Sequence, residues 1–113
     1  MDKIEYIYDK QKDYGYIKSI EIHREIDKEE FSKFNVKVAL VKFPCQDADD
    51  LFEITFERVS NLKIGDIENL FKVFMQITFI GDYQREDENY IVTESENDLF
   101  SFSCKNISFN CKE

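Results

Sequence analysis

Apolar and polar residues alternate repeatedly between positions 52 and 109, and this alternation constrains the fold more than any other feature. The pattern is cleanest over residues 52–57, where every second residue is Phe or Ile. A period of two places successive side chains on opposite faces of a strand, so that one face is apolar and the other polar. The segment therefore predicts a β-rich domain whose strands bury one face.

The same reasoning predicts further strands on both sides of this segment. β-Branched and aromatic residues favour strands, and Pro44 ends one of them because proline cannot donate to a sheet ladder. The further strands are expected over residues 14–23, 36–43, 73–80, 90–93, 99–103 and 107–109.

The last three strands are separated by short turn sequences, which favour an antiparallel meander. Lys105-Asn106 is read as the turn of a hairpin. In that register Cys104 and Cys111 lie on one face but several residues apart, too far for a disulfide. The predicted core face consists of Phe100, Phe102, Ile107 and Phe109.

Two segments carry helical signals. Asp27 with Glu30 forms a capping signature that predicts a helical turn over residues 27–34. Apolar residues at helical spacing follow Asp66 and predict a short helix over residues 66–74. The predicted fold is mainly β: an antiparallel curved sheet or compact β-sandwich of roughly six to eight strands with one or two short helices.

Composition predicts one folded domain over residues 1–113. The chain contains one proline and three glycines and has no linker or repeat, while aromatic residues make up 15% of it, which argues against disorder. No apolar stretch is long enough to cross a bilayer, and the first residues lack the basic and apolar regions of a signal peptide. These features, with an odd cysteine count, predict a cytoplasmic protein with reduced thiols and no membrane partner.

No set of catalytic or cofactor-binding residues can be assembled from the sequence. His23 is the only histidine, and the cysteines have no basic cluster beside them to form a thiolate. The acidic loop that contains Asp47, Asp49 and Asp50 lacks the glycine and distal Glu of a calcium-binding loop. We therefore expect no enzymatic activity, no metal and no cofactor.

The charge balance points to a protein partner. The formal net charge is −9, which disfavours direct binding to nucleic acid. Acidic clusters flanked by aromatic residues supply both long-range attraction for a basic partner and rigid contact area. The predicted partner-binding residues are Asp82, Tyr83, Glu86, Asp87, Glu88 and Tyr90. The alternative reading is that these are solvated loop charges that block strand pairing.

Residues 56–64, and residues 89–92 followed by 99–107, resemble small bacterial immunity proteins of polymorphic-toxin systems. The resemblance covers positions 52–109, and none of its motifs is catalytic. It implies a cytosolic protein that binds and neutralises a toxin domain. No toxin-contacting position can be carried over from it, and residues 1–33 show no resemblance.

These observations favour a protein-binding module, an acidic immunity protein or inhibitor of a basic toxin domain or enzyme. One alternative is a small-ligand-binding or enzymatic β-barrel whose many Phe and Tyr residues line a cavity. A second alternative is a structural, self-associating module that forms a homodimer by pairing edge strands across a two-fold axis.

Overall fold

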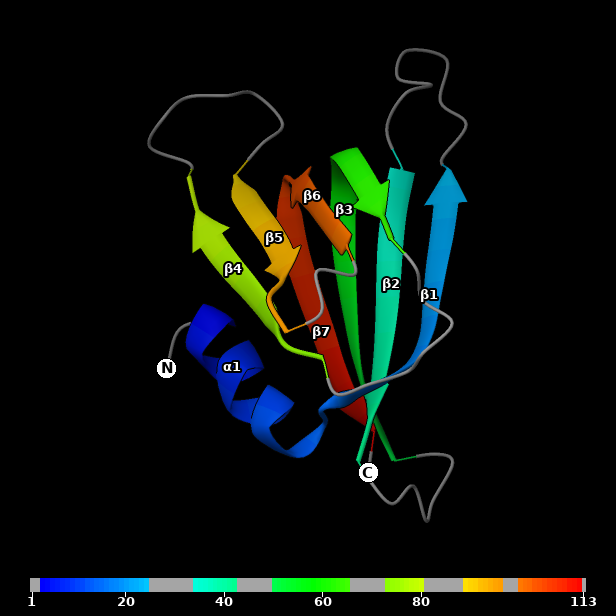
Figure 1. The fold of residues 1–113 in the computed structure, drawn as a ribbon, viewed down its shortest axis with the longest axis vertical. Coiled ribbons are helices and arrows are strands. Elements are labelled where there is room, and N and C mark those ends of the chain that lie inside the picture. The colour runs from blue at the N-terminus through cyan, green and yellow to red at the C-terminus, as the bar shows by residue number, and fades with distance from the viewer. Residues whose placement is uncertain are drawn as a thin grey trace.

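The computed structural model describes residues 3–24, 34–42, 50–65, 73–80, 89–96 and 100–112. Within these ranges it contains one helix and seven strands (Figure 1). In chain order they are α1 (Lys3–Asp13), β1 (Tyr16–Arg24), β2 (Phe34–Val41), β3 (Leu51–Ile64), β4 (Met75–Phe79), β5 (Tyr90–Glu94), β6 (Phe100–Cys104) and β7 (Asn106–Lys112).

All seven strands belong to one antiparallel sheet with the order β1-β2-β3-β6-β5-β4, and β7 also pairs with β3. The sheet is not closed, because β1 and β4 end the order without pairing with each other. Helix α1 lies beside β4 and the lower part of β7 (Figure 1). The predicted fold, a mainly β protein with an antiparallel curved sheet and a short helix, is confirmed.

Strand β3 bends in its middle. Arg58 and Asn61 adopt positive φ angles of 54° and 58°, a left-handed conformation that is uncommon outside glycine. The pairings of β3 with β2 and with β6 both shift register near these residues, as β-bulges do. The N–H of Arg58, displaced from the ladder, donates to Oδ1 of Asn35 at 3.1 Å. The bend directs the two halves of β3 into two halves of the sheet.

The predicted hairpin at Lys105-Asn106 is wrong. Strands β6 and β7 run in the same direction, and both pair antiparallel with β3, β6 with its second half and β7 with its first. The N–H of Lys105 still donates to the carbonyl oxygen of Glu57 at 2.9 Å, so the chain continues along β3. Strand β3 is long enough to pair with both β6 and β7. The turn-like sequence between these two strands therefore lies at the bend of the sheet.

Cys104 and Cys111 are therefore kept apart by a geometry different from the predicted hairpin. Both are free cysteines, separated by seven residues of nearly extended chain, roughly 20 Å. Burial raises the pKa of the Cys104 thiol to about 12, so this group is protonated at neutral pH. The third cysteine, Cys45, lies outside the described residues.

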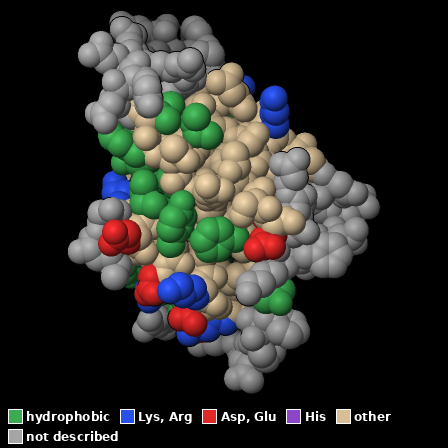
Figure 2. Space-filling view, turned by 60° about the vertical axis from the view of Figure 1, so that its left-hand side comes forward, with side chains coloured by type: hydrophobic (Ala, Val, Ile, Leu, Met, Phe, Trp, Pro, Cys, Tyr) green, Lys and Arg blue, Asp and Glu red, His purple; other side chains and the backbone are tan. Residues whose placement is uncertain are grey.

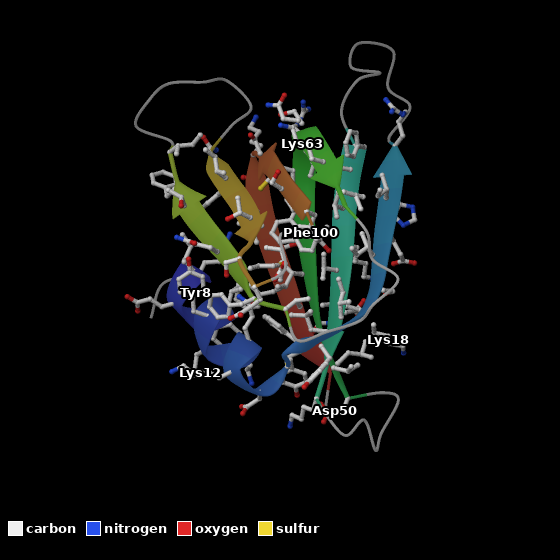
Figure 3. All side chains as sticks on the ribbon, in the orientation of Figure 1. Tyr8, Lys12, Lys18, Asp50, Lys63 and Phe100 are labelled. Carbon is white, nitrogen blue, oxygen red and sulfur yellow. The ribbon has the colours of Figure 1, made fainter. Side chains whose placement is uncertain are left out.

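The core lies on the inner face of the bent sheet. Phe52, Ile54 and Phe56 of β3 are fully buried, as the alternation predicts. Phe100, Phe102 and Ile107 are also buried, which confirms most of the predicted core face, and Phe109 packs against this cluster while half-buried. Figure 3 shows Phe100 in the space between β6 and β2, where the two halves of the sheet meet.

The described helix, α1, lies in a part of the chain for which the sequence signals predict none. Sequence reasoning gave no prediction of helix for residues 3–13, whereas Ile7 and Gln11 of α1 are almost completely buried. The helical turn predicted over residues 27–34 lies outside the described residues except for Phe34, which begins β2. Most of the helix predicted over residues 66–74 is also outside them; Val73 and Phe74 are described and are not helical.

Side chains fill the space between the two halves of the sheet. Among the described residues, the gap lined by Ile20, Leu62, Ile64 and their neighbours has a volume of only about 10 Å³. That is at most room for one water molecule. This gap between described residues is not the enclosed, Phe- and Tyr-lined cavity that the ligand-binding alternative requires.

Truncation of the core is expected to be costly at Phe102. Its side chain is 3% exposed and its ring lies edge-on to that of Phe56, with centroids 4.9 Å apart. Phe102→Ala should lower the free energy of unfolding by about 3–5 kcal/mol, because it removes buried apolar contacts and leaves a cavity. Urea denaturation followed by circular dichroism measures the change.

Phe79→Ala provides a control with the same chemical change. Phe79 is 52% exposed, so the loss should be less than about 1 kcal/mol. Equal losses for the two variants would contradict the assignment of the inner face.

Candidate functional site

Two side chains of α1 cover the outer edge of β4. The Gln11 amide accepts a hydrogen bond from the N–H of Met75 at 2.6 Å and donates to the Met75 carbonyl at 3.0 Å. The Tyr8 hydroxyl does the same with Ile77, at 2.9 Å from its N–H and 3.0 Å from its carbonyl. Figure 3 shows Tyr8 where α1 meets β4. Both side chains supply the bonds that a neighbouring strand would otherwise make.

Helix and strand spacing make this arrangement possible. Three residues of helix advance by about 4.5 Å, and two residues of strand by about 6.6 Å. Tyr8 and Gln11 therefore lie one above the other on one helix face, close to the spacing of Ile77 and Met75, and the helix runs opposite to β4. Gln11 is 1% exposed, so its amide is satisfied mainly by this edge.

The covering ends at Phe79, the next residue of β4 whose main-chain N–H and carbonyl point away from β5. One turn before Tyr8 the helix carries Ile4, which has no side-chain group to bond the strand. Here the surface forms a depression of about 370 Å³ lined by Lys3, Ile4, Phe79 and Tyr90, which we call the edge depression. The rings of Phe79 and Tyr90 lie 5.4 Å apart, and Phe79 remains 52% exposed.

Hydrophobic side chains form a stripe on the side of the molecule that carries α1 and β4, with charged side chains below it (Figure 2). Tyr8, Phe74 and Tyr90 are partly buried on this side, and the rings of Tyr8 and Phe74 lie 5.4 Å apart. An exposed aromatic residue beside half-buried ones is typical of a contact surface for another protein.

Of the predicted partner-binding residues, the structure describes only Tyr90, which lies in the edge depression. Asp82, Tyr83, Glu86, Asp87 and Glu88 lie outside the described residues, in the connection between β4 and β5. The two residues that flank this connection are held together, because the N–H of Ile80 donates to the carbonyl of Asn89 at 2.6 Å. The acidic connection therefore begins and ends next to Phe79 and Tyr90.

Sequence reasoning missed Lys3, Ile4 and Phe79. Phe79 had a usable signal: it follows Met75 and Ile77 at the strand period of two, so the three share a face. No signal in the sequence predicts that the Phe79 side chain is exposed, because its exposure depends on how far α1 extends along β4. Lys3 has a further structural role, since its ammonium donates to the main-chain oxygen of Ile107 in β7 at 2.6 Å.

A second polar cluster lies at the lower end of the sheet, where Figure 3 labels Asp50. The hydroxyl of Tyr14, a residue 1% exposed, donates to Oδ1 of Asp50 at 2.6 Å. The Lys42 ammonium lies 3.5 Å from Asp50 and 4.9 Å from the centre of the Tyr14 ring. The thiol of Cys111 also reaches the Tyr14 oxygen, at 3.6 Å.

Proton affinities in this cluster follow from its hydrogen bonds. The bond from Tyr14 lowers the pKa of Asp50, and Lys42 lowers it further, against the opposing effect of burial. The same bond, together with burial and Cys111, raises the pKa of Tyr14. The cluster therefore holds a carboxylate and a neutral phenol together, an arrangement that fixes β3 to the chain preceding β1.

The other groups considered for chemistry are not assembled into a site. His23 is exposed on β1, and the described part of the chain has no group of three or more potential metal ligands. Asp47 and Asp49 lie outside the described residues. The helix that the structure describes is too short and too polar to cross a membrane.

The described residues form an open antiparallel sheet with one covered edge and an exposed aromatic surface beside that edge. The chain belongs to the family of immunity protein PIM8, whose model matches residues 1–110. The match includes the N-terminal region in which sequence reasoning found no resemblance. No curated protein and no solved structure matched the chain. Membership implies a toxin as the protein partner, and immunity proteins are generally not enzymes.

Loss of the Gln11 amide should destabilise the contact between α1 and β4. Gln11→Ala removes two hydrogen bonds and leaves the Met75 amide and carbonyl without partners in a buried site. We expect a loss of about 1–3 kcal/mol in the free energy of unfolding, with faster hydrogen exchange at the Met75 amide. Lys12→Ala is the control, because the Lys12 side chain is 75% exposed. Unchanged exchange at Met75 in the Gln11 variant would contradict the covering of this edge.

Tyr14→Phe should raise the pKa of Asp50, because it removes the hydrogen bond that contributes most to lowering it. A carboxyl group with a lowered pKa in the folded chain stabilises the fold above its unfolded pKa, and this contribution is lost as pH falls through the folded pKa. In the variant this contribution should be smaller, and its loss on acidification should be complete at a higher pH. Carbon-detected NMR titration of the Asp50 carboxyl measures the shift.

Tyr16→Phe, at a partly exposed tyrosine nearby in sequence, is the control for the loss of a hydroxyl. An Asp50 pKa that is the same in Tyr14→Phe as in the original chain would show that Lys42, and not Tyr14, sets it.

Proposed function

We propose that residues 1–113 form a single β-rich domain that acts as a cytoplasmic immunity protein. In this proposal it neutralises a toxin domain by binding it with the edge depression and the acidic connection over residues 81–88. Membership of an immunity-protein family supports the class of function. The single structural observation that supports the location is Phe79, more than half exposed beside Tyr90 at the base of that connection.

Exposure of Phe79 has a cost that a bound partner would remove. Met75 and Ile77 of the same strand face are almost completely buried, whereas the third residue of the row remains open to water. Contact with a partner would bury the ring, and aromatic residues in the centre of an interface contribute most to holding the complex together. We infer that Phe79 and Tyr90, with Tyr83, form the apolar centre of the contact.

Charge supports a basic partner. Asp82, Glu86, Asp87 and Glu88 provide four carboxylates within the connection that starts and ends at the edge depression, and the whole chain has a net charge of −9. Such a cluster would attract a basic toxin surface over a distance and increase the association rate. In this proposal the acidic residues mainly set how fast the complex forms, and the aromatic residues set how long it lasts.

The test uses the toxin domain encoded next to the gene for this chain, expressed with it in a growth assay. The original chain should restore growth, and Phe79→Asp should not, because an unpaired carboxylate would be buried at the centre of the contact. With the purified toxin domain, reversing the charges at Glu86, Asp87 and Glu88 should slow association and flatten its salt dependence, whereas Phe79→Asp and Tyr83→Ala should mainly speed dissociation.

Ile91→Asp is the matched control. Ile91 is 40% exposed and adjacent to Tyr90 in β5, but its side chain lies on the opposite face of the sheet. This variant should protect cells as well as the original chain does. Loss of protection with Ile91→Asp but not with Phe79→Asp would place the toxin on the other face and overturn the proposed site.

A further inference from the structure

The strand order ends in β4 on one side and β1 on the other, and only the edge of β4 is covered by the described helix. Helix α1 covers β4 through Tyr8 and Gln11 and contacts β7 through Lys3 and through Tyr6, whose ring stacks on Phe109 at 4.6 Å. Strand β1 is the opposite end of the sheet order, and none of the described strands pairs with its outer edge. An open edge is a template for pairing with another chain, so its features decide what can pair there.

Two features protect the first part of β1 from pairing. A register shift against β2 lies between Ile17 and Ser19, and the intervening Lys18 is exposed. Bulges and edge lysines both hinder the addition of a strand. The second part of the strand, from Ile20 to Arg24, is regular against β2 and has neither a bulge nor a lysine. An added strand would therefore pair with this part.

Ile22 is at the centre of this part and is 49% exposed. It lies opposite Val36 of β2, which is 1% exposed, so Ile22 continues the inner apolar face to the rim of the sheet. Glu21 and His23, its neighbours, are exposed on the other face. The open part thus carries the apolar residues Ile20 and Ile22, the acidic Glu21, and the basic side chains of His23 and Arg24.

We propose that β1 pairs with β1 of a second copy of the chain, antiparallel and about a two-fold axis at Ile22. In this register Ile22 meets Ile22 of the second copy, and Glu21 meets His23 of the second copy twice, once on each side of the axis. Ile20, Ile22 and Arg24 share one face, with each Ile20 opposite Arg24 of the second copy, and the two pairs of Glu21 with His23 share the other face. The partner is a second copy because this short pattern complements itself.

Other symmetric registers are less favourable. Along β1 the main-chain groups of every second residue point to the outer edge, and the same residues do so in both copies. The two-fold axis must therefore pass through a residue and not between two residues. Centring the pairing on Glu21 sets two glutamates opposite each other and Lys18 opposite Arg24. Centring it on Ile20 brings the irregular Lys18 into the ladder opposite Ile22. Of these three registers, only pairing at Ile22 avoids both like charges and the bulge.

Strand β1 lies at the opposite end of the strand order from β4 and the edge depression. The proposed dimer therefore does not depend on the proposed toxin contact. Each strand contributes only about five paired residues, and such a small interface forms at high concentration. Sedimentation equilibrium of the full chain, over a concentration series up to the millimolar range, should show a monomer and dimer in exchange.

Variants at the edge test the register. Ile22→Lys should weaken the dimer roughly tenfold or more, because it replaces the central apolar pair by two like charges. Glu21→Lys should also weaken it, and the double variant Glu21→His with His23→Glu should restore it, since the swap recreates both pairs. Ile91→Lys, on a residue 40% exposed in β5, should leave the dimer unchanged. Circular dichroism checks that every variant is folded.

A chain that stays monomeric throughout the series overturns the proposal, as does a dimer that neither Ile22→Lys nor Glu21→Lys weakens. If the β1 amides instead become protected from hydrogen exchange only when the neighbouring toxin domain is added, the edge belongs to the toxin. That result would reject the dimer while leaving the immunity function in place.

Discussion

The bend of β3 at Arg58 and Asn61 is the constraint on which the rest of the structure depends. A straight strand of that length would carry both β6 and β7 on one flat sheet, whose apolar face could not cover itself. The left-handed residues turn the second half of the strand, so that Phe56 and Phe102 meet across the bend with ring centroids 4.9 Å apart. A single sheet thereby provides both walls of the core, and α1 has only to cover what the bend leaves open.

Helix α1 then decides where the surface is available for contact. Its residues Tyr8 and Gln11 make the hydrogen bonds that a neighbouring strand would make along β4. Ile4, in its first turn, has no side-chain group that could bond the main chain of Phe79. The boundary between covered and uncovered edge is therefore set by the change from Tyr8 to Ile4 along one helix face. The proposed toxin contact lies at that boundary, where an exposed ring and the acidic connection come together.

Sequence reasoning found most strands because they depend on local alternation, as at Phe52, Ile54 and Phe56. It failed where a long-range partner decides the outcome. Lys105-Asn106 has turn composition, but the chain does not reverse there, because β3 pairs with the strands on both sides of it. The helix was missed although Ile4, Ile7 and Gln11 recur at helical spacing, because Gln11 is polar and the remaining apolar stripe is only two residues long. Of the proposed contact residues that the structure describes, the sequence predicted Tyr90 but not Phe79, whose exposure depends on the reach of α1.

The helix that covers β4 is the first element of the chain, and its partners are far along it. Gln11 bonds a residue 64 positions later, Tyr8 one 69 positions later, and Lys3 one 104 positions later. A helix of 11 residues is marginal by itself and gains its stability from these contacts. During synthesis α1 therefore cannot make all of these contacts until β4 and β7 have left the ribosome. The edge of β4 therefore stays open until α1 can bond a strand that is made long after the helix.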